Sequence, residues 1–208
     1  MNDAQHRLWI LGGLAVAAGV GLVVVANSQK QTILQAPSSP TKTPTSTKKR
    51  VFPGARMLLL GDSLAVGLKA PMGQLANDFG VSFRARGVVG SRIADWAKST
   101  SVDEEMAFGP TIVMLSIGTN DMKMLSPVSE KKDLGILLSK LGSGGADVVI
   151  IGPPKMPFPD NGVRQMLASS GATVFPSDAL IIPRGPDKIH PTAKGYSGWA
   201  GAIWAWLG

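Results

Sequence analysis

Short apolar runs alternate with longer helix-like stretches from residue 57 to the C-terminus. The apolar runs predict strands at 57–60, 81–85, 111–117, 147–151 and 172–175. The stretches between and after them predict helices that reach residue 79, span 91–98, 129–141 and about 162–170, and close the chain at 191–207. Strands that alternate with helices in this way are typical of an α/β fold with a mainly parallel sheet. In such sheets the loops beyond the carboxyl ends of the strands carry the functional site.

A different pattern precedes this region. Residues 8–26 form an unbroken apolar stretch of 19 residues, about the length of a helix that crosses a hydrocarbon core of roughly 30 Å. We therefore expect residues 1–27 to be a retained membrane anchor. A cleaved signal peptide is the alternative, although the apolar cores of signal peptides usually run for about 7–15 residues.

Small residues recur every four positions within this stretch, at Gly13, Ala17 and Gly21. That spacing would let two such helices pack closely, as in a homodimer through the membrane helix. The alternative is that small residues are simply frequent in membrane helices.

The next segment has the composition of a tether. Residues 28–52 are rich in Ser, Thr, Pro, Gln and Lys and contain almost nothing to bury, which predicts a disordered linker. The expected organisation is a membrane anchor at 1–27, a linker at 28–52 and one folded domain at 53–208.

The basic charge of the chain belongs mainly to this linker. Residues 28–56 carry +6 of the net +7, which leaves +1 for residues 57–208. The folded domain is nearly neutral and has no basic stripe with interleaved aromatic residues, so we expect no nucleic-acid partner.

Two residue types limit the chemistry of the domain. The chain contains no cysteine, which excludes a disulfide framework, a catalytic thiol and a cysteine zinc site. His6 precedes the apolar stretch, so His190 is the one imidazole in the folded part. A metal site with two or three histidine ligands cannot be built there, and we expect no metal.

Three short blocks supply the groups that acyl transfer needs. The first is Gly61-Asp62-Ser63-Leu64, in which Ser63 should lie where the first strand turns into a helix. Its hydroxyl would be the nucleophile, and its backbone N–H would lie at a positive helix terminus suited to an oxyanion. The alternative is a serine that merely caps the helix.

The last block is Asp187-Lys188-Ile189-His190, just before the final helix. One loop can bring the carboxylate of Asp187 to Nδ1 of His190 and leave Nε2 to act as the base for Ser63. The alternatives are a surface histidine beside a proline and an exposed aspartate at a helix entry.

The middle block is Gly118-Thr119-Asn120-Asp121, after the third predicted strand. The amide of Asn120 is the candidate donor to the oxyanion, together with the N–H groups of Ser63 and Gly90. The alternative is an asparagine that only braces its turn.

These blocks resemble the SGNH, or GDSL, family of esterases and lipases, and the resemblance covers residues 56–208. The glycine of the family's second block falls at Gly90, with Gly87 as the fallback, and Ser91-Arg92 departs from the family pattern. The resemblance implies a three-layer α/β/α sandwich with a mainly parallel sheet of about five strands. It also implies hydrolysis through an acyl-serine intermediate and no cofactor.

The expected function is a membrane-tethered serine hydrolase that cleaves short acyl esters, with acetyl the preferred group and an acylated carbohydrate a candidate substrate. The resemblance implies that the domain lies on the periplasmic or extracellular side, whereas the basic linker alone favours the cytoplasmic side. Two alternatives stay open. One is a catalytically silent binding or structural protein of an envelope or virion membrane on an esterase scaffold. The other is an acyltransferase that uses the same triad.

Overall fold

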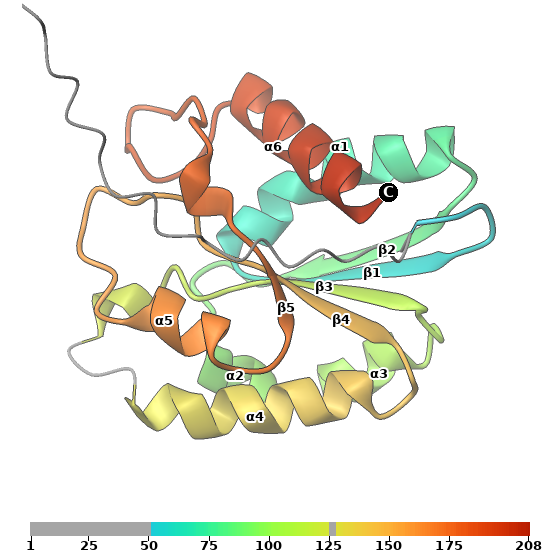
Figure 1. Cartoon of the computed structure of the whole chain (residues 1–208), viewed down its shortest axis with the longest axis horizontal. Helices are drawn as coiled ribbons and strands as arrows, with labels where there is room; N and C mark the ends of the chain where they lie inside the picture. Colours follow the sequence, from blue (N-terminus) through green and yellow to red (C-terminus); the bar gives the residue numbers. More distant parts are fainter. Residues whose placement is uncertain (1–50, 125–127) are drawn as a thin grey trace, which may run out of the picture. The chain divides into compact units, whose positions relative to one another are not determined.

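A five-stranded, wholly parallel sheet in the order β2-β1-β3-β4-β5 forms the centre of the domain (Figure 1). The structure is a computed structural model that describes residues 51–124 and 128–208. The strands are β1 Arg56–Gly61, β2 Ser82–Gly87, β3 Ile112–Ser116, β4 Asp147–Ile151 and β5 Thr173–Phe175. The predicted α/β class with a parallel sheet of about five strands is confirmed.

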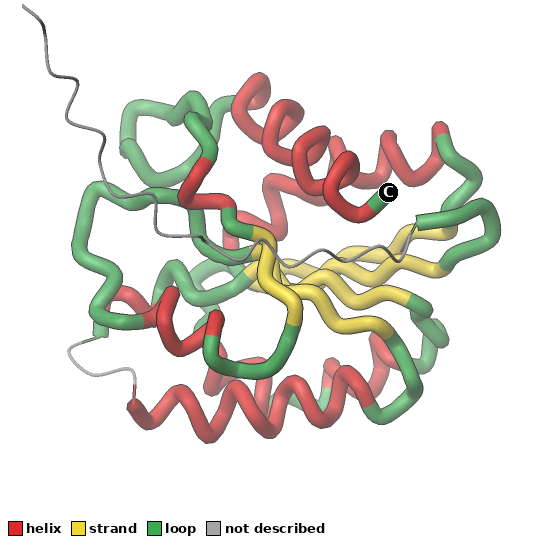
Figure 2. Tube along the Cα trace, in the orientation of Figure 1, coloured by secondary structure: helices red, strands yellow, loops and turns green. Residues whose placement is uncertain are grey.

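Helices cover both faces of this sheet, which gives three layers (Figures 1 and 2). One face carries α1 and α6, and the other carries α2, α3, α4 and α5. Their bounds are α1 Ser63–Asp78, α2 Ile93–Lys98, α3 Ser101–Met106, α4 Val128–Gly142, α5 Val163–Ala168 and α6 Ala193–Leu207, with short 3-10 helices at Asp121–Lys123 and Ser177–Ala179.

The central strands are apolar because they are buried on both faces. Residues 57–60 of β1 and all five residues of β3 are buried. A strand covered by helices on both sides has no solvent face, so it is a continuous apolar run instead of an alternating one. This is why the pattern at 57–60 and 111–117 predicts strands at nearly the observed positions.

The strand register brings the carboxyl ends of three neighbouring strands level with one another. Gly61 of β1 lies opposite Gly87 of β2 and opposite Ser116 of β3. Strand β2 pairs with one edge of β1, and β3 pairs with the opposite edge. The order of the strands along the sheet therefore reverses between β1 and β3. Ligand sites of open α/β sheets lie in the crevice at such a reversal.

The remaining differences from the sequence prediction are small. Helix α3 was not predicted, and α6 begins at Ala193 instead of 191 because the side chain of Thr192 caps it by accepting from Gly195 N at 3.1 Å. Helix α2 begins at Ile93 instead of 91 because residues 88–91 form a turn, in which Ser91 N donates to the carbonyl of Val88 at 3.1 Å.

The predicted membrane helix at 8–26 and all but the end of the predicted linker at 28–52 lie outside the described residues. Within 51–124 and 128–208, no helix is both long enough and apolar enough to span a bilayer. The membrane anchor therefore stays a prediction.

Candidate active site

Ser63 is the first residue of α1 and follows β1 after a single intervening residue, Asp62. This turn depends on Gly61, which has a φ of +152°. A Cβ at Gly61 would lie 1.8 Å from the backbone oxygen of Ser116, so a larger residue does not fit there. The cap of α1 is Asp62, whose carboxylate accepts from Leu64 N at 2.8 Å. The alternative reading of Ser63 as a helix cap is therefore wrong, and its hydroxyl is available for other chemistry.

That hydroxyl meets His190, which lies 127 residues further along the chain. Ser63 Oγ is 2.9 Å from His190 Nε2, within hydrogen-bond distance. On the other side of the ring, His190 Nδ1 is 2.6 Å from Asp187 Oδ2. The three side chains thus form a continuous relay from carboxylate to imidazole to hydroxyl.

Asp187 is held by its own loop as well as by the imidazole. Its Oδ1 accepts the backbone N–H groups of Ile189 and His190, both at 2.9 Å. The hydrogen bond from the His190 side chain, followed by these two backbone bonds, lowers the pKa of Asp187 to about 2. The carboxylate is therefore ionised at neutral pH, and it fixes the imidazole tautomer that leaves Nε2 free to accept the serine proton.

Asn120 follows β3, beside the strand that leads to Ser63. Its Nδ2 donates to the backbone carbonyl of Ser91 at 3.0 Å. An amide NH₂ group has two N–H donors, so this bond uses one and leaves the other for a ligand. Asn120 therefore does brace the loops, as the alternative reading holds, and it keeps the donor that the oxyanion role requires.

The two candidate glycines of the second block have different surroundings. Gly87 is the last residue of β2, and a Cβ there would lie 2.6 Å from Val66 Cγ2. Gly90 lies in the turn after β2 with a φ of +79°, and no atom lies within 4 Å of the position that a Cβ would take. Gly90 also precedes Ser91, the residue that Asn120 contacts. Of the two, Gly90 is thus the one in an open turn beside Asn120.

Three buried carboxylic acids lie beneath these loops: Asp62, Asp121 and Glu130. Asp121 Oδ1 accepts from Ile93 N at 3.2 Å, and Glu130 Oε2 accepts from Ala94 N at 3.1 Å, so both satisfy orphan N–H groups at the start of α2. Burial raises the pKa of Asp121 to about 7 and that of Asp62 to about 6. In Asp121 the negative charge of Glu130 adds to the effect.

Ser63, His190, Asp187 and Asn120 supply the kinds of group that acyl transfer uses. Across residues 51–124 and 128–208, no three His, Asp or Glu side chains are grouped to hold a metal ion. Acyl transfer uses a nucleophilic hydroxyl, a base, a group that orients the base, and amide donors near the nucleophile.

The sequence singled out Ser63, Asp187 and His190, which the structure joins in one relay, and Asn120 and Gly90, which lie in adjoining loops after β3 and β2. It missed the role of Asp62 as the cap, although aspartate before a helix is a recognisable cap signal. It also missed the burial of Asp121 and Glu130. No local sequence pattern indicates that these two acids are buried. They are buried where α2 packs against α4, and β3 lies between these helices in the sequence.

Comparison with solved structures places this arrangement among known folds. TesA superimposes with a TM-score of 0.59 at 20% identity, over 73% of this chain and 97% of TesA. A lipolytic protein of the G-D-S-L family from Desulfitobacterium hafniense DCB-2 superimposes with a TM-score of 0.59 at 14% identity, over 73% of this chain and 99% of its own. The chain has the SGNH hydrolase fold.

A third solved structure matches the chain to a similar extent. The esterase EstA from Pseudoalteromonas sp. has a TM-score of 0.55 at 17% identity, over 72% of this chain and 94% of its own. No protein-family model and no curated protein sequence matches the chain.

Proposed function

We propose that this chain is a serine hydrolase that cleaves short acyl esters through an acyl-serine intermediate. The observation that carries the proposal is the relay from Asp187 to His190 to Ser63, with contacts of 2.6 and 2.9 Å. Support also comes from the fold, which this chain shares with the esterase EstA and with a lipolytic protein of the G-D-S-L family.

In the first half of the reaction, Ser63 Oγ attacks the ester carbonyl while its proton passes to His190 Nε2. The carbonyl oxygen becomes an oxyanion, which accepts hydrogen bonds from the free N–H of Asn120 and the backbone N–H groups of Ser63 and Gly90. The ester C–O bond then breaks, and His190 returns the proton to the departing alcohol. Asp187 stabilises the imidazolium at each stage.

In the second half, water replaces the alcohol. His190 takes a proton from the water, whose oxygen attacks the acyl-serine carbonyl, and the same donors stabilise the second oxyanion. Collapse of this intermediate breaks the bond to Ser63 Oγ, which regains its proton from His190 and releases the carboxylic acid.

The preferred substrate class is an acetyl ester on a carbohydrate. The side chains of His190 and Asp187 are 43% and 48% exposed, so the site lies open at the surface of the domain. An open site suits a small acyl group displayed on a large body. Structures with the same fold include an acetyl esterase and a carbohydrate esterase of family 3 from Talaromyces cellulolyticus, each with a TM-score of 0.51 and 18% identity.

The proposal includes a membrane tether. The apolar stretch at 8–26 has the length of a membrane helix, and the polar segment at 28–52 would hold the domain at a distance from the bilayer. Protease treatment of intact and opened cells tests the expected location of the domain on the periplasmic or extracellular side.

The experiment that tests the catalytic proposal is hydrolysis of 4-nitrophenyl acetate, butyrate and octanoate by the full chain in a neutral detergent. Ser63→Ala is expected to abolish turnover, whereas Ser197→Ala, which removes an exposed hydroxyl on α6, is expected to retain it. A fluorophosphonate should label Ser63 in the wild-type protein. A folded protein that neither turns over any ester nor is labelled would overturn the proposal. Product analysis with added alcohols separates transfer from hydrolysis.

A further inference from the structure

The loop that carries Asp187 and His190 is irregular but well connected within itself. Thr192 N donates to the carbonyl of Pro183 at 2.9 Å, and Gly185 N donates to the carbonyl of His190 at 2.8 Å. An isolated antiparallel bridge joins Arg184 and Pro191. These bonds make residues 183–192 a narrow, closed loop, with Asp187 in its tip and His190 at the last backbone bond before the tip.

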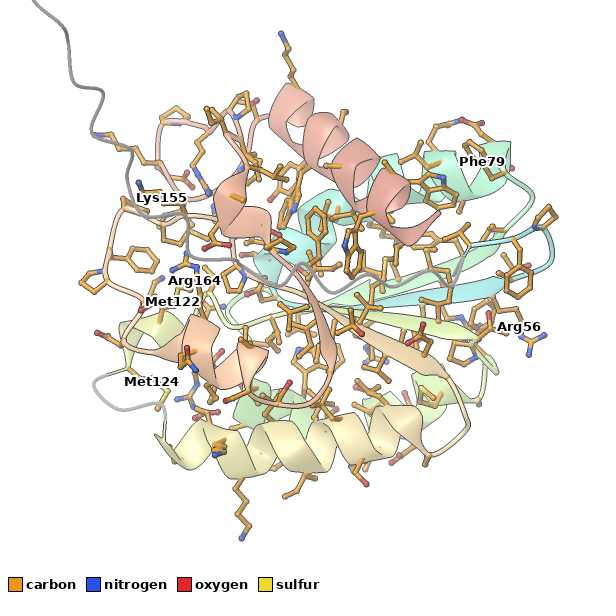
Figure 3. All side chains as sticks on the ribbon, in the orientation of Figure 1. Arg56, Phe79, Met122, Met124, Lys155 and Arg164 are labelled. Atoms are coloured by element: carbon orange, nitrogen blue, oxygen red, sulfur yellow. The ribbon has the colours of Figure 1, made fainter. Side chains whose placement is uncertain are left out.

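The side chain of Arg184 connects this loop to the loop that follows β4. One terminal nitrogen donates to the backbone carbonyl of Ile189, the residue directly before His190. The other, Nη2, donates to the backbone carbonyl of Lys155 at 2.8 Å, in the loop that follows β4. The guanidinium therefore connects the backbone beside the catalytic base to a segment anchored on the sheet. Figure 3 shows Lys155 on the same side of the domain as Met122, which belongs to the short 3-10 helix after β3.

This connection matters because two of the three side chains of the relay are largely exposed to solvent. The side chains of both His190 and Asp187 are more than 40% exposed, so packing alone does not fix them. Arg184 is partly buried, and this burial lowers the pKa of its guanidinium. A planar guanidinium can span two carbonyl groups with its two terminal nitrogens, whereas the single ammonium of lysine has no such fork.

We propose that Arg184 is a positioning residue for catalysis: its fork holds the Asp187–His190 loop against the loop after β4, so that His190 Nε2 stays within reach of Ser63 Oγ. This inference rests on the proposed function. Arg184 does not touch the reacting atoms, and it acts through its bonds to the backbone carbonyls of Ile189 and Lys155. A small displacement of the imidazole is enough to lower the rate, because proton transfer requires hydrogen-bond distance between base and nucleophile.

The neighbouring Arg164 provides a matched control. It also donates from Nη2 to a backbone carbonyl, that of Pro154, at 2.9 Å, and it pairs with Asp160 at 3.2 Å. It thus stabilises the same loop after β4 by the same kind of contact but has no bond to the loop of His190. Loss of Arg164 therefore tests whether general support of this loop explains the effect of Arg184.

The experiment compares Arg184→Gln, Arg184→Lys and Arg164→Gln in the full chain, with 4-nitrophenyl acetate as the probe. We expect kcat to fall about 10- to 100-fold in both Arg184 variants with KM within about twofold, and to stay within about threefold of wild type in Arg164→Gln. In Arg184→Ala, added guanidinium ion should restore part of the lost kcat, and it should not do so in Arg164→Ala.

A second readout does not depend on turnover. The short Nδ1–H bond from His190 to Asp187 should give a strongly downfield proton NMR signal in the wild-type protein, and that signal should broaden or disappear in Arg184→Lys. Unchanged kcat in folded Arg184 variants, or a rise in KM alone, would overturn the inference and leave the proposed function intact. No turnover by the wild-type protein would overturn the proposed function, and this inference with it.

Discussion

The side-chain amide of Asn120 donates to the backbone carbonyl of Ser91 at 3.0 Å, and this bond ties the loop after β3 to the turn that contains Gly90. A second bond runs beside it, from Ile93 N to the carboxylate of Asp121 at 3.2 Å. Two loops that are distant in sequence are thus held together at the edge of the sheet where Ser63 begins α1. These two bonds therefore hold the proposed oxyanion donors of Asn120 and Gly90 in position relative to each other.

Replacement of Asn120 should affect the transition state more than the ground state. We expect Asn120→Ala and Asn120→Asp to lower kcat about 10²- to 10³-fold, because each removes a donor aimed at the developing negative charge, while KM changes by less than about threefold. Steady-state kinetics with 4-nitrophenyl acetate measure both constants.

Asn161→Asp is the control for this prediction. The Nδ2 of Asn161 braces a nearby loop by donating to the carbonyls of Met122 and Met124 at 2.8 and 2.9 Å. Asp tolerates the positive φ of this position, +49°, nearly as well as Asn does. The control should lose these bracing bonds and retain kcat within about fivefold. Equal losses of kcat in the two aspartate variants would show that bracing, and not charge stabilisation, is the role of Asn120.

Removal of the charge on Asp187 should disable the base without unfolding the domain. In Asp187→Asn, the amide no longer fixes the imidazole with Nδ1 protonated, so the Nε2 that faces Ser63 is no longer held as the acceptor. We expect kcat to fall by about 10³-fold or more, while the melting temperature changes little because the side chain is nearly half exposed. Circular dichroism and ester kinetics on the same preparation decide this. A variant with near-normal kcat would remove Asp187 from the relay.

The buried acid Asp121 should make the stability of the domain depend on pH. Its folded-state pKa, raised to about 7 mainly by burial, lies above the value of about 4 expected in the unfolded chain. Between these two pKa values the folded state keeps a proton that the unfolded chain releases. The contribution of Asp121 to the free energy of unfolding is therefore fully present below about pH 4 and is lost as the pH rises through about 7. The slope for one such group has an upper limit of about 1.4 kcal/mol per pH unit.

Asp121→Asn tests this pH dependence, because the amide oxygen can still accept from Ile93 N but cannot ionise. Between pH 4 and pH 8, the free energy of unfolding of the variant should rise relative to that of wild type, by up to about 4 kcal/mol. Urea titrations at several pH values give this difference. Parallel profiles for the two proteins would show that Asp121 ionises without cost in the folded state.

The turn before Ser63 should be intolerant of any side chain at Gly61. A Cβ there would overlap the backbone oxygen of Ser116, which no side-chain movement can relieve. We expect Gly61→Ala to lower the free energy of unfolding by roughly 3 kcal/mol and to lower kcat, because the displaced turn carries the nucleophile.

Gly135→Ala provides the contrast. Gly135 lies within α4, and no atom lies within 4 Å of the position that its Cβ would take. Since glycine is a poor helix residue, this change should raise the free energy of unfolding by about 0.5–1 kcal/mol. Thermal and urea unfolding of both variants test the pair, and equal effects would contradict the account of the Gly61 turn.

The sequence alone was sufficient for the architecture and for the identity of the chemical groups. Apolar runs such as residues 57–60 predict strands because helices bury them on both faces, and that burial leaves a local pattern. The relay was also predictable, because Ser63, Asp187 and His190 lie in short blocks with characteristic neighbours, and the domain contains no second histidine to compete with His190.

Only the tertiary structure decided which groups surround and support the relay. The bonds of Arg184 to the carbonyls of Ile189 and Lys155 cannot be predicted from the sequence. Every residue has a backbone carbonyl, so the type of the acceptor residue does not matter for such a bond. The raised pKa of Asp121 depends mainly on its burial and, to a smaller extent, on the charge of Glu130, and both acids bond to the start of α2, which packs on α4. An apolar run shows in the local sequence that a strand is buried, whereas the burial of a single polar side chain and its long-range hydrogen bonds arise only when distant segments pack together.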